Sequence, residues 1–540
     1  MIDSFRTFWD KVGCRKRYWI PVLFFTISTF GYSVFSRTIS IDDLSADFYV
    51  GSTHPMIGAN RWGMEVIHRL AAIPRVSPGS DRLLATMFLM LAGILLSALF
   101  FRLHHADQGI LRPTKYTILT CSLITYPMIG EIWEYTGANY ISTGGMLLSI
   151  VTCYYMLTRE RIRGNDLLLG AVLMTIPMSS YESGVAFYVT LVCGILFYRY
   201  CVWGERNRKW YYWKTAISFV LVLVLALCFR LLIGSLLRWI LKVPKGFSGE
   251  AVISWGEANL VDMLRRLYIE TVLNYGINGL VYLPIGVFCA AVVFLAIYAI
   301  YKTIEKKSIM VIVGSGIFLL SVFTLTLIQG SIMFYRTALP LSVFSSVTFF
   351  CLAEALERQK KIIRTITTLL FFYLIWIQSS FLNSELALNN QRSENEMRTM
   401  SIVAQRILSL DSEKPVVFIG QYNMGNYINE TKTVDSESAS GKIYEKLVNR
   451  LQNAYGDYFH FFTHFTSFPT TNVNSVINWA LKANEMEDYL SYLGFDIQVV
   501  DMWAEKDIVA EAKEIAESTR MHSYSVMEAE SFIIASLHLS

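Results

Sequence analysis

Two adjacent carboxylates stand where the chain first leaves a long apolar run. Asp42 and Asp43 follow the run 18–36 after a short polar stretch. Neighbouring side chains point in different directions, so one carboxylate can face a reacting centre while the other caps a helix or holds a cation. A carboxylate at the edge of a bilayer is suited to act as a general base on an acceptor hydroxyl, provided that its surroundings tune its pKa. The alternative is that Asp43 only caps a juxtamembrane helix.

A guanidinium group opens a late apolar run, in the sequence Phe334-Tyr335-Arg336-Thr337. A guanidinium remains charged when it is buried, and it binds phosphate through two parallel hydrogen bonds. Arg336 is therefore suited to hold the phosphate of a lipid carrier. The alternative is an arginine that merely extends its charged end to the membrane interface.

The segment that follows the acidic pair alternates apolar and charged residues. Arg61 precedes an apolar stripe with helical spacing, formed by Trp62, Val66, Ile67 and Leu70. This pattern predicts an amphipathic helix in the membrane interface, whose basic face can meet lipid phosphate. The alternative is an ordinary surface helix.

Further acidic and aromatic residues lie at the ends of other apolar runs. Glu131 and Glu134 follow the run 116–130, and Tyr181 and Glu182 lie in the short turn after the run 166–179. Charged groups near hydrocarbon are costly, so they usually face a wet cavity or a partner. Aromatic residues at such positions more often anchor the chain in the interface than bind sugar.

The elements that must position these residues are membrane-spanning helices. The chain has 540 residues, of which 54% are hydrophobic and only 17% charged, and its mean hydropathy is +0.40. Apolar runs long enough to cross a bilayer as helices recur along it, which excludes a water-soluble protein of two or three domains. We expect an all-α polytopic membrane protein with about eleven spans: 18–36, 83–101, 116–130, 140–158, 166–179, 184–200, 215–236, 279–301, 309–328, 332–353 and 365–382.

The distribution of basic residues predicts the orientation of these spans. Lys and Arg concentrate in 1–17 and in every second loop between the spans, the loops that lie on the same side of the membrane as 1–17. The positive-inside rule then places the N-terminus in the cytoplasm and the loops 37–82 and 237–278 outside. The basic residues lie in short loops rather than on one continuous face, and the sequence therefore predicts no nucleic-acid partner.

The remainder of the chain, 383–540, has a different composition. Acidic residues outnumber basic ones, and strand-like runs at 416–419, 497–500 and 532–535 alternate with helical stretches such as 442–453 and 505–519. We expect a small extracytoplasmic α/β domain, after a transmembrane domain that covers 1–382.

No metal or disulfide framework is evident in the cysteines and histidines. The eight cysteines include no CxxC pair, and neither His54 nor His68 has ligand spacing. The sequence predicts no protein-bound metal and no cofactor, and the alternative is a divalent cation held by the acidic pair.

The pattern resembles the membrane-embedded GT-C glycosyltransferases that use polyprenyl-phosphate sugars, in particular the bacterial O-antigen glucosyltransferases. The resemblance covers roughly 20–380 and is carried by the following features: Asp42-Asp43, Arg61-Trp62, Tyr181-Glu182-Ser183, and Tyr335-Arg336 with Pro340. The family pattern has Gly before the Arg and Gln after the first Tyr, where this chain has Asn60 and Glu182.

The resemblance implies transfer of a hexose, with glucose the expected sugar, from undecaprenyl phosphate to a surface polysaccharide or teichoic-acid-like acceptor. The enzyme would lie in a bacterial inner membrane and act on its outer face. Asp42 or Asp43 would be the base, and Arg61 and Arg336 would bind the donor phosphate. The sugar or acceptor would contact residues at the outer ends of the spans: Glu131, Glu134, Tyr181 and Glu182.

Two other functions fit a multi-span protein with charged outer loops. A cell-envelope glycan polymerase or ligase would be expected to concentrate its functional Arg and His in one large late loop, whereas the loop near 330 is short. A lipid-linked sugar transporter would place ionisable groups at mid-membrane. Arg230 is the one candidate for that, and the sequence offers it no evident acidic partner.

Overall fold

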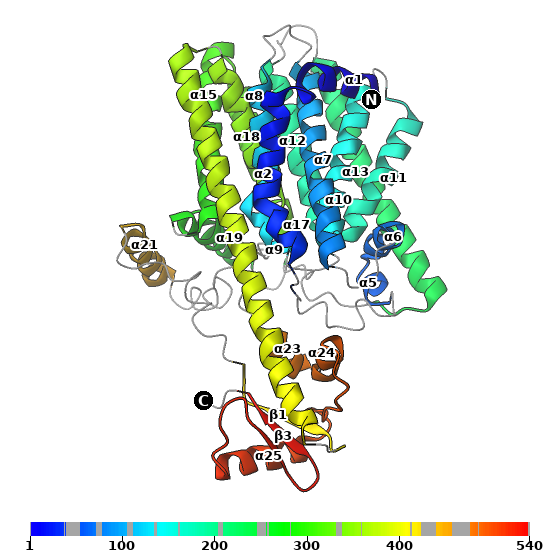
Figure 1. The fold of residues 1–540 in the computed structure, drawn as a ribbon. Coiled ribbons are helices and arrows are strands. Elements are labelled where there is room, and N and C mark those ends of the chain that lie inside the picture. Colours follow the sequence, from blue (N-terminus) through cyan, green and yellow to red (C-terminus); the bar gives the residue numbers. More distant parts are fainter. Residues whose placement is uncertain are drawn as a thin grey trace.

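The computed structural model shows a bundle of long helices from which one helix projects toward a smaller C-terminal unit (Figure 1). The structure describes residues 2–36, 38, 54–71, 78–104, 112–133, 138–159, 162–202, 209–245, 255, 259–280, 282–330, 337–357, 359–410, 413–422, 439–455, 476–483 and 485–537.

The bundle is formed by helices that cross it in alternating directions. Its elements are α1 (Ile2–Phe8), η1 (Trp9–Gly13), α2 (Lys16–Phe35), α5 (His54–Gly58), α6 (Trp62–Ala71), α7 (Pro78–His104), α8 (Pro113–Ile124), η3 (Pro127–Ile129), α9 (Gly130–Trp133), α10 (Ala138–Thr158), α11 (Gly164–Ser180), α12 (Ser183–Val202), α13 (Lys209–Leu241), α14 (Leu260–Tyr275), η5 (Ile277–Leu280), α15 (Leu283–Lys306), α16 (Met310–Ser321), α17 (Thr324–Gln329), α18 (Pro340–Glu357) and α19 (Lys361–Leu408).

Each of the eleven predicted spans overlaps a helix, and the prediction of an all-α polytopic membrane protein is confirmed. In the described part of the chain, eight helices are long and apolar enough to cross a membrane: α2, α7, α10, α12, α13, α15, α18 and α19. The other three predicted spans fall on α8, α11 and α16, which have 12, 17 and 12 residues, fewer than the roughly 20 of a full crossing. The count of eleven therefore stays a prediction.

Proline and local geometry explain where predicted spans and helices differ. The run 116–130 is interrupted after α8 because Pro127 lacks a backbone N–H for a helical hydrogen bond, and a short 3-10 turn follows. In the run 332–353 the helix α18 begins at Pro340, a residue whose fixed φ suits the first helical turn.

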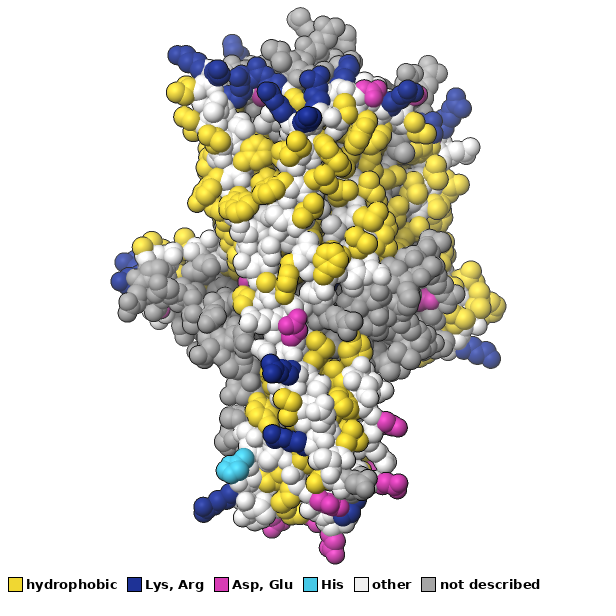
Figure 2. All heavy atoms as spheres, viewed as in Figure 1, with side chains coloured by type: hydrophobic (Ala, Val, Ile, Leu, Met, Phe, Trp, Pro, Cys, Tyr) yellow, Lys and Arg dark blue, Asp and Glu magenta, His cyan; other side chains and the backbone are white. Residues whose placement is uncertain are grey.

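Two ends of the bundle are distinguished by charge. We call the end where α2, α8 and α19 begin the basic end, and the end where α2, α11 and α13 finish the rim. On the face that Figure 2 displays, Lys and Arg side chains gather at the basic end, next to a broad belt of apolar side chains. This distribution matches the predicted orientation, with the basic end cytoplasmic, which stays a prediction.

Polar side chains join the helices inside the bundle. The hydroxyl groups of Tyr18 on α2 and Thr120 on α8 share a 2.8 Å hydrogen bond, and Thr120 is in turn 2.7 Å from the hydroxyl of Ser97 on α7. Gly93 lets α7 approach closely, since a Cβ there would lie 3.0 Å from Thr120. Such satisfied contacts between small residues hold helices together where lipid supplies no hydrophobic force.

The C-terminal unit has its own hydrophobic cores on both sides of a small sheet. The elements are β1 (Val416–Ile419), α23 (Val476–Ala483), α24 (Met486–Tyr492), α25 (Lys506–Ser518), β2 (Val526–Glu528) and β3 (Ile533–Ser536), whereas α21 (Ala439–Tyr455) lies beside the bundle and contacts η5 (Figure 1). The sheet has the order β1-β3-β2, with β1 parallel and β2 antiparallel to β3. Strands occur where two of the three strand-like runs predict them, and the third, 497–500, makes a single parallel bridge from Val499 to Val416.

One helix of 48 residues, α19, joins the bundle to this unit without a break. Leu382 and Leu386 belong to the bundle's core, whereas Met400 and Ile407 pack with Phe418 in the core of the C-terminal unit. The predicted domain boundary at 382 therefore falls within a continuous helix. The division at this point, and the extracytoplasmic side of the unit, stay predictions.

Candidate functional site

The end of α2, which leads toward the acidic pair, is held by an arginine of α7. Arg82 is only 3% exposed, and its Nη1 donates to the carbonyl oxygens of Ser33 and Ser36 at 3.1 and 2.9 Å. It also donates to the Ser36 hydroxyl at 2.9 Å. These carbonyls belong to the end of α2, where few backbone N–H groups are left to satisfy them, and among the other described residues the Ser33 carbonyl receives only the Ser36 N–H and hydroxyl. A cation there complements the helix dipole and fixes where the chain leaves α2.

A second contact ties α9 to the same turn. Trp133 donates from its indole nitrogen to the Ser33 hydroxyl at 3.1 Å, and its ring stacks on Phe30 at 4.3 Å between centroids. Glu131 is on α9, two residues before Trp133, so its backbone lies at the rim beside the end of α2. The side chain of Glu131 lies outside the described part.

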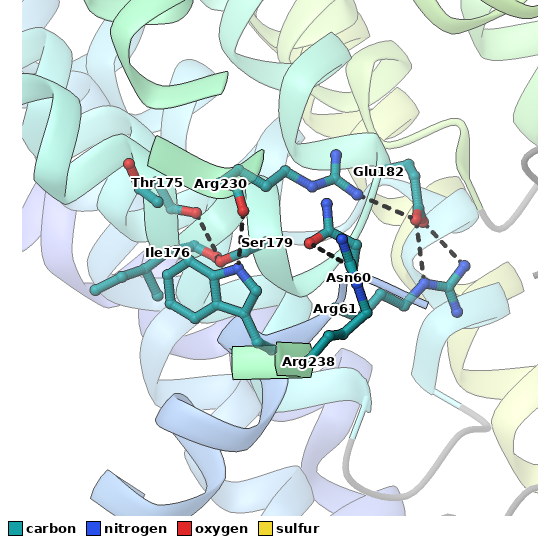
Figure 3. Close-up of polar contacts among 9 residues, drawn as sticks. Asn60, Arg61, Thr175, Ile176, Ser179, Glu182, Arg230 and Arg238 are labelled. Atoms are coloured by element: carbon teal, nitrogen blue, oxygen red, sulfur yellow. Dashed lines mark hydrogen bonds and ion pairs between the residues drawn. The ribbon is translucent and has the colours of Figure 1, made fainter. Parts of the chain in front are cut away.

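A paired guanidinium and carboxylate form the centre of the site (Figure 3). Arg61, which begins the α6 region, donates from Nη2 and Nε to the two oxygens of Glu182 at 2.9 and 3.1 Å. This is the bidentate geometry that gives arginine and carboxylate both strength and a fixed orientation. The Arg61 guanidinium also lies 5.4 Å from the ring centre of Tyr181. The structure thus brings together three of the predicted site residues from two distant segments.

Arg230 of α13 is a second cation on the same carboxylate. Its Nη2 lies 3.6 Å from Oε1 of Glu182, and its side chain is 15% exposed. The interpretation that Arg230 has no acidic partner is wrong, because that partner comes from the turn between α11 and α12. The backbone carbonyl of Arg230 accepts a 3.2 Å hydrogen bond from the indole of Trp62, and this bond joins α6 to α13.

The charges around Glu182 determine its ionisation. Burial favours the neutral carboxyl, but the charge of Arg61, its hydrogen bonds and the charge of Arg230 outweigh burial and lower the pKa of Glu182. The group is therefore an anion at neutral pH. Two guanidinium groups share this one carboxylate, so the three side chains together carry a positive charge.

The backbone before Arg61 explains one departure from the family pattern. Asn60 has φ +61°, a left-handed conformation in which Gly is free and Asn is the next best tolerated residue. Gly234 of α13 faces it, and a Cβ at Gly234 would lie 1.7 Å from the Asn60 side-chain oxygen. Asn60 also accepts a hydrogen bond from Arg238 at 3.4 Å. Asn thus replaces Gly without loss of the turn and adds a contact to α13.

Close packing also seats α6 on the end of α11. A Cβ at Gly63 would lie 2.3 Å from the Ser179 hydroxyl and 2.6 Å from the carbonyl oxygen of Ile176. Only glycine allows this approach. A helix, α6, is present where the amphipathic pattern predicts one, and its apolar Trp62 and Ile67 are buried; its position in the membrane interface stays a prediction.

Four predicted site residues lie outside the described residues: Asp42, Asp43, Glu134 and Arg336. Their described neighbours lie at the rim, since Ser36 ends α2 and Trp133 ends α9. Leu339, three residues after Arg336, lines a crevice of about 10 Å³ with Tyr181 and Ser183. The start of α18 is therefore next to the turn that carries Glu182. The catalytic roles of the acidic pair and of Arg336 stay predictions.

Sequence reasoning missed Arg82. Arg82 follows Asp81 at the start of a span, and both are at most 3% exposed. The signal for it was present, because a charged pair inside the first turn of an apolar helix is costly unless it is paired. In the described part of the chain, no group of three His, Cys, Asp or Glu side chains is arranged to hold a metal.

Arg61, Glu182 and Arg230 together form what we call the rim cluster. A family model described as glucosyl transferase GtrII matches residues 31–353, which include the rim cluster and every predicted site residue. The chain belongs to this glucosyl transferase family. No curated protein matches the chain. Family membership makes the protein a glycosyltransferase built into a helical membrane bundle, which agrees with the resemblance drawn from the acidic pair and the arginines.

Proposed function

We propose that this family member transfers glucose from undecaprenyl phosphate to a cell-surface glycan on the outer face of a bacterial inner membrane. The observation that carries this proposal is the shared carboxylate of Glu182 with Arg61 and Arg230 at the rim. The donor is a phosphodiester and carries one negative charge. A cluster of two guanidinium groups and one carboxylate has the opposite charge, already oriented before the donor arrives.

The surface of α13 suits a donor that is carried by a lipid. Apolar side chains around and beyond Arg230 are exposed on this helix: Leu231, Leu232, Leu236, Trp239 and Ile240. A polyprenyl chain can lie along them while its phosphate reaches the arginines. The sequence also favours a lipid-linked donor over a nucleotide sugar, because it predicts no glycine-rich phosphate loop.

The proposed chemistry needs one base and one stabilised leaving group. The acceptor hydroxyl oxygen forms a bond to the anomeric carbon of glucose, and the bond from that carbon to the phosphate oxygen breaks. The hydroxyl proton moves to Asp42 or Asp43, and undecaprenyl phosphate leaves with its additional negative charge. Arg61, Arg230 and Arg336 would stabilise that charge, since it develops in the transition state.

Glu182 has two proposed tasks in this scheme. It holds the two guanidinium groups in place, and oxygen lone pairs that the arginines do not use can accept hydrogen bonds from glucose hydroxyls. Tyr181 lies beside the Arg61 guanidinium and offers an aromatic face to the sugar. Glu131 and Glu134 remain proposed contacts of the sugar or the acceptor.

The test is glucose transfer by the full-length protein in lipid nanodiscs, with radiolabelled undecaprenyl-phosphate glucose and purified surface polysaccharide. We expect Asp42→Asn or Asp43→Asn to lower the rate by about 100-fold or more, the range of a lost general base, without loss of folding. Full transfer by both variants would contradict the assignment of the base. Transfer from radiolabelled UDP-glucose, in the absence of any lipid-linked donor, would contradict the proposed donor.

A further inference from the structure

A cavity of about 510 Å³ opens at the basic end, far from the rim cluster. Its walls come from the starts of α2, α8 and α19 and from the end of α18. The charged residues that line it are Arg15, Arg17, Arg112, Lys115, Glu357 and Arg364. Five cations and one carboxylate surround it, so the cavity is strongly positive. This surplus distinguishes it from the rim, where two arginines share a carboxylate.

The inner wall of the cavity is a buried polar network. Lys115 is 1% exposed, and its Nζ donates to Glu357 at 3.1 Å and to Nε2 of His104 at 3.2 Å. Because an ammonium group only donates, Nε2 accepts and the ring proton is on Nδ1, which faces Glu354 at 3.3 Å. Lys115 is thereby fixed, and its charge is balanced by Glu357 alone among the residues of the cavity.

Arg112 supplies an unused donor beside this network. Its Nη1 is buried and has no hydrogen-bond partner among the described residues. A buried guanidinium nitrogen without an acceptor is costly, and an anion in the cavity would satisfy it. Arg364, on the first turn of α19, lines the same cavity and is half-buried.

The rest of the lining combines apolar side chains with four threonines, Thr114, Thr365, Thr367 and Thr368. Ile118, Leu356, Leu369 and Phe371 line the cavity, and Leu369 is 64% exposed on the outer surface of α19. The cavity therefore reaches the outer surface of the bundle at Leu369. A molecule that fills it needs an anionic head and an apolar tail.

We propose that this cavity binds the phosphate headgroup of an anionic phospholipid from the membrane leaflet at the basic end. The phosphate would contact Arg112, Arg364 and Lys115, and an acyl chain would lie against Leu369. Basic pockets between membrane helices are suited to such headgroups because the phosphate is held by charge and the chains remain in hydrocarbon. The site is independent of the proposed transfer reaction.

Native mass spectrometry of the full-length protein tests this proposal. The protein is released from nanodiscs of three parts phosphatidylcholine to one part phosphatidylglycerol, and the retained lipid is identified. We expect wild type to retain phosphatidylglycerol, and Arg112→Gln with Arg364→Gln to lower the retained fraction by about tenfold. The matched control is Lys16→Gln with Lys361→Gln, which removes the same charge from exposed positions on α2 and α19 outside the cavity.

The proposal would be overturned if the cavity variant retained as much phosphatidylglycerol as wild type. It would also be overturned if the control variant lost as much phosphatidylglycerol as the cavity variant. Thr368→Phe, which fills the cavity without a change of charge, provides a second variant should the first fail to fold. It is expected to lower retention as well, and unchanged retention would count against the site.

Two further arms separate a lipid headgroup from free phosphate. Inorganic phosphate in millimolar excess is expected to leave the bound phosphatidylglycerol in place, because it lacks the acyl chains. Displacement of the lipid by inorganic phosphate would overturn the assignment to a phospholipid, and equal retention of phosphatidylcholine would overturn the requirement for an anionic lipid.

Discussion

The two ends of the bundle use arginine in different ways. At the rim, Arg61 and Arg230 share the carboxylate of Glu182, which fixes their positions and leaves a small positive charge. At the basic end, the cavity residues have few carboxylates, and a nitrogen of Arg112 has no partner in the described part. An arginine held by a carboxylate is oriented for a reaction, whereas a cluster of arginines with little compensation is suited to hold an anion. The predictions below test this contrast at the rim, from the largest expected effect to the smallest.

Removal of the shared carboxylate should have the largest effect. Glu182→Ala leaves two guanidinium groups close together and mostly buried, and we expect a loss of about 3 kcal/mol in the free energy of unfolding. Glucose transfer should fall with it. Glu182→Gln, which restores the residue of the family pattern, should cost about 1 kcal/mol because its amide oxygen still accepts a hydrogen bond. Thermal unfolding in detergent measures the stability of both variants. An equal loss of unfolding free energy in the two would contradict the role of the side chain at position 182 as a hydrogen-bond acceptor.

Loss of the second arginine should weaken donor binding more than it weakens folding. Arg230→Ala is expected to raise KM for the lipid-linked donor by about tenfold, the value of one hydrogen bond to a charged group. Arg230→Lys should recover part of the lost donor affinity, since a lysine keeps the charge but not the two parallel N–H donors of a guanidinium. Lys214→Ala is the control, because it removes one exposed charge from the same helix at the opposite end. A KM that stays at the wild-type value in Arg230→Ala would remove α13 from the donor site.

Acid should weaken the rim through Glu182. The pKa of this carboxyl is lower in the folded protein than its usual value of 4.5, because its two arginines favour the anion over the neutral form that burial favours. Its contribution to stability is therefore complete above about pH 5, and it is lost as pH falls through the lower folded value. We expect the melting temperature of wild type to fall more steeply between about pH 5 and 3 than that of Glu182→Gln. Parallel curves for the two proteins would show that Glu182 does not carry the effect.

The left-handed residue before Arg61 should give the smallest effect. Asn60→Gly is expected to change the free energy of unfolding by less than about 0.5 kcal/mol, because glycine adopts this conformation freely but loses the bond to Arg238. Asn60→Ala should cost about 1 kcal/mol, since alanine is strained at positive φ. Transfer assays and thermal unfolding distinguish the two, and an alanine variant as stable as the glycine variant would argue against this account of Asn60.

The sequence was sufficient to place the helices but not to pair their charges. Hydropathy located a helix at each predicted run, eight of them long enough for a bilayer crossing in the described part of the chain, because a crossing needs about 20 apolar residues. It placed the end of the last span at 382, yet α19 continues to Leu408, since the residues after Leu382 become polar without a Gly or Pro to end the helix. The strand β2 has only three residues, too few for a pattern of alternation.

The rim cluster was predicted residue by residue rather than as a cluster. Arg61, Tyr181 and Glu182 were each assigned to the outer side, because charged groups are tolerated only at the ends of spans. That Glu182 joins Arg61 to Arg230 depends on how α6, α11 and α13 pack together. This packing is set by Gly63 and Gly234, whose roles appear only when the helices are in contact.

The unbroken course of α19 has a mechanical consequence. At 1.5 Å per residue its 48 residues form a rod of about 72 Å. Such a rod does not stretch as a linker would, so the sheet at its far end stands at a set height above the bundle. The helix therefore acts as a stiff spacer that fixes the separation between the bundle and the sheet.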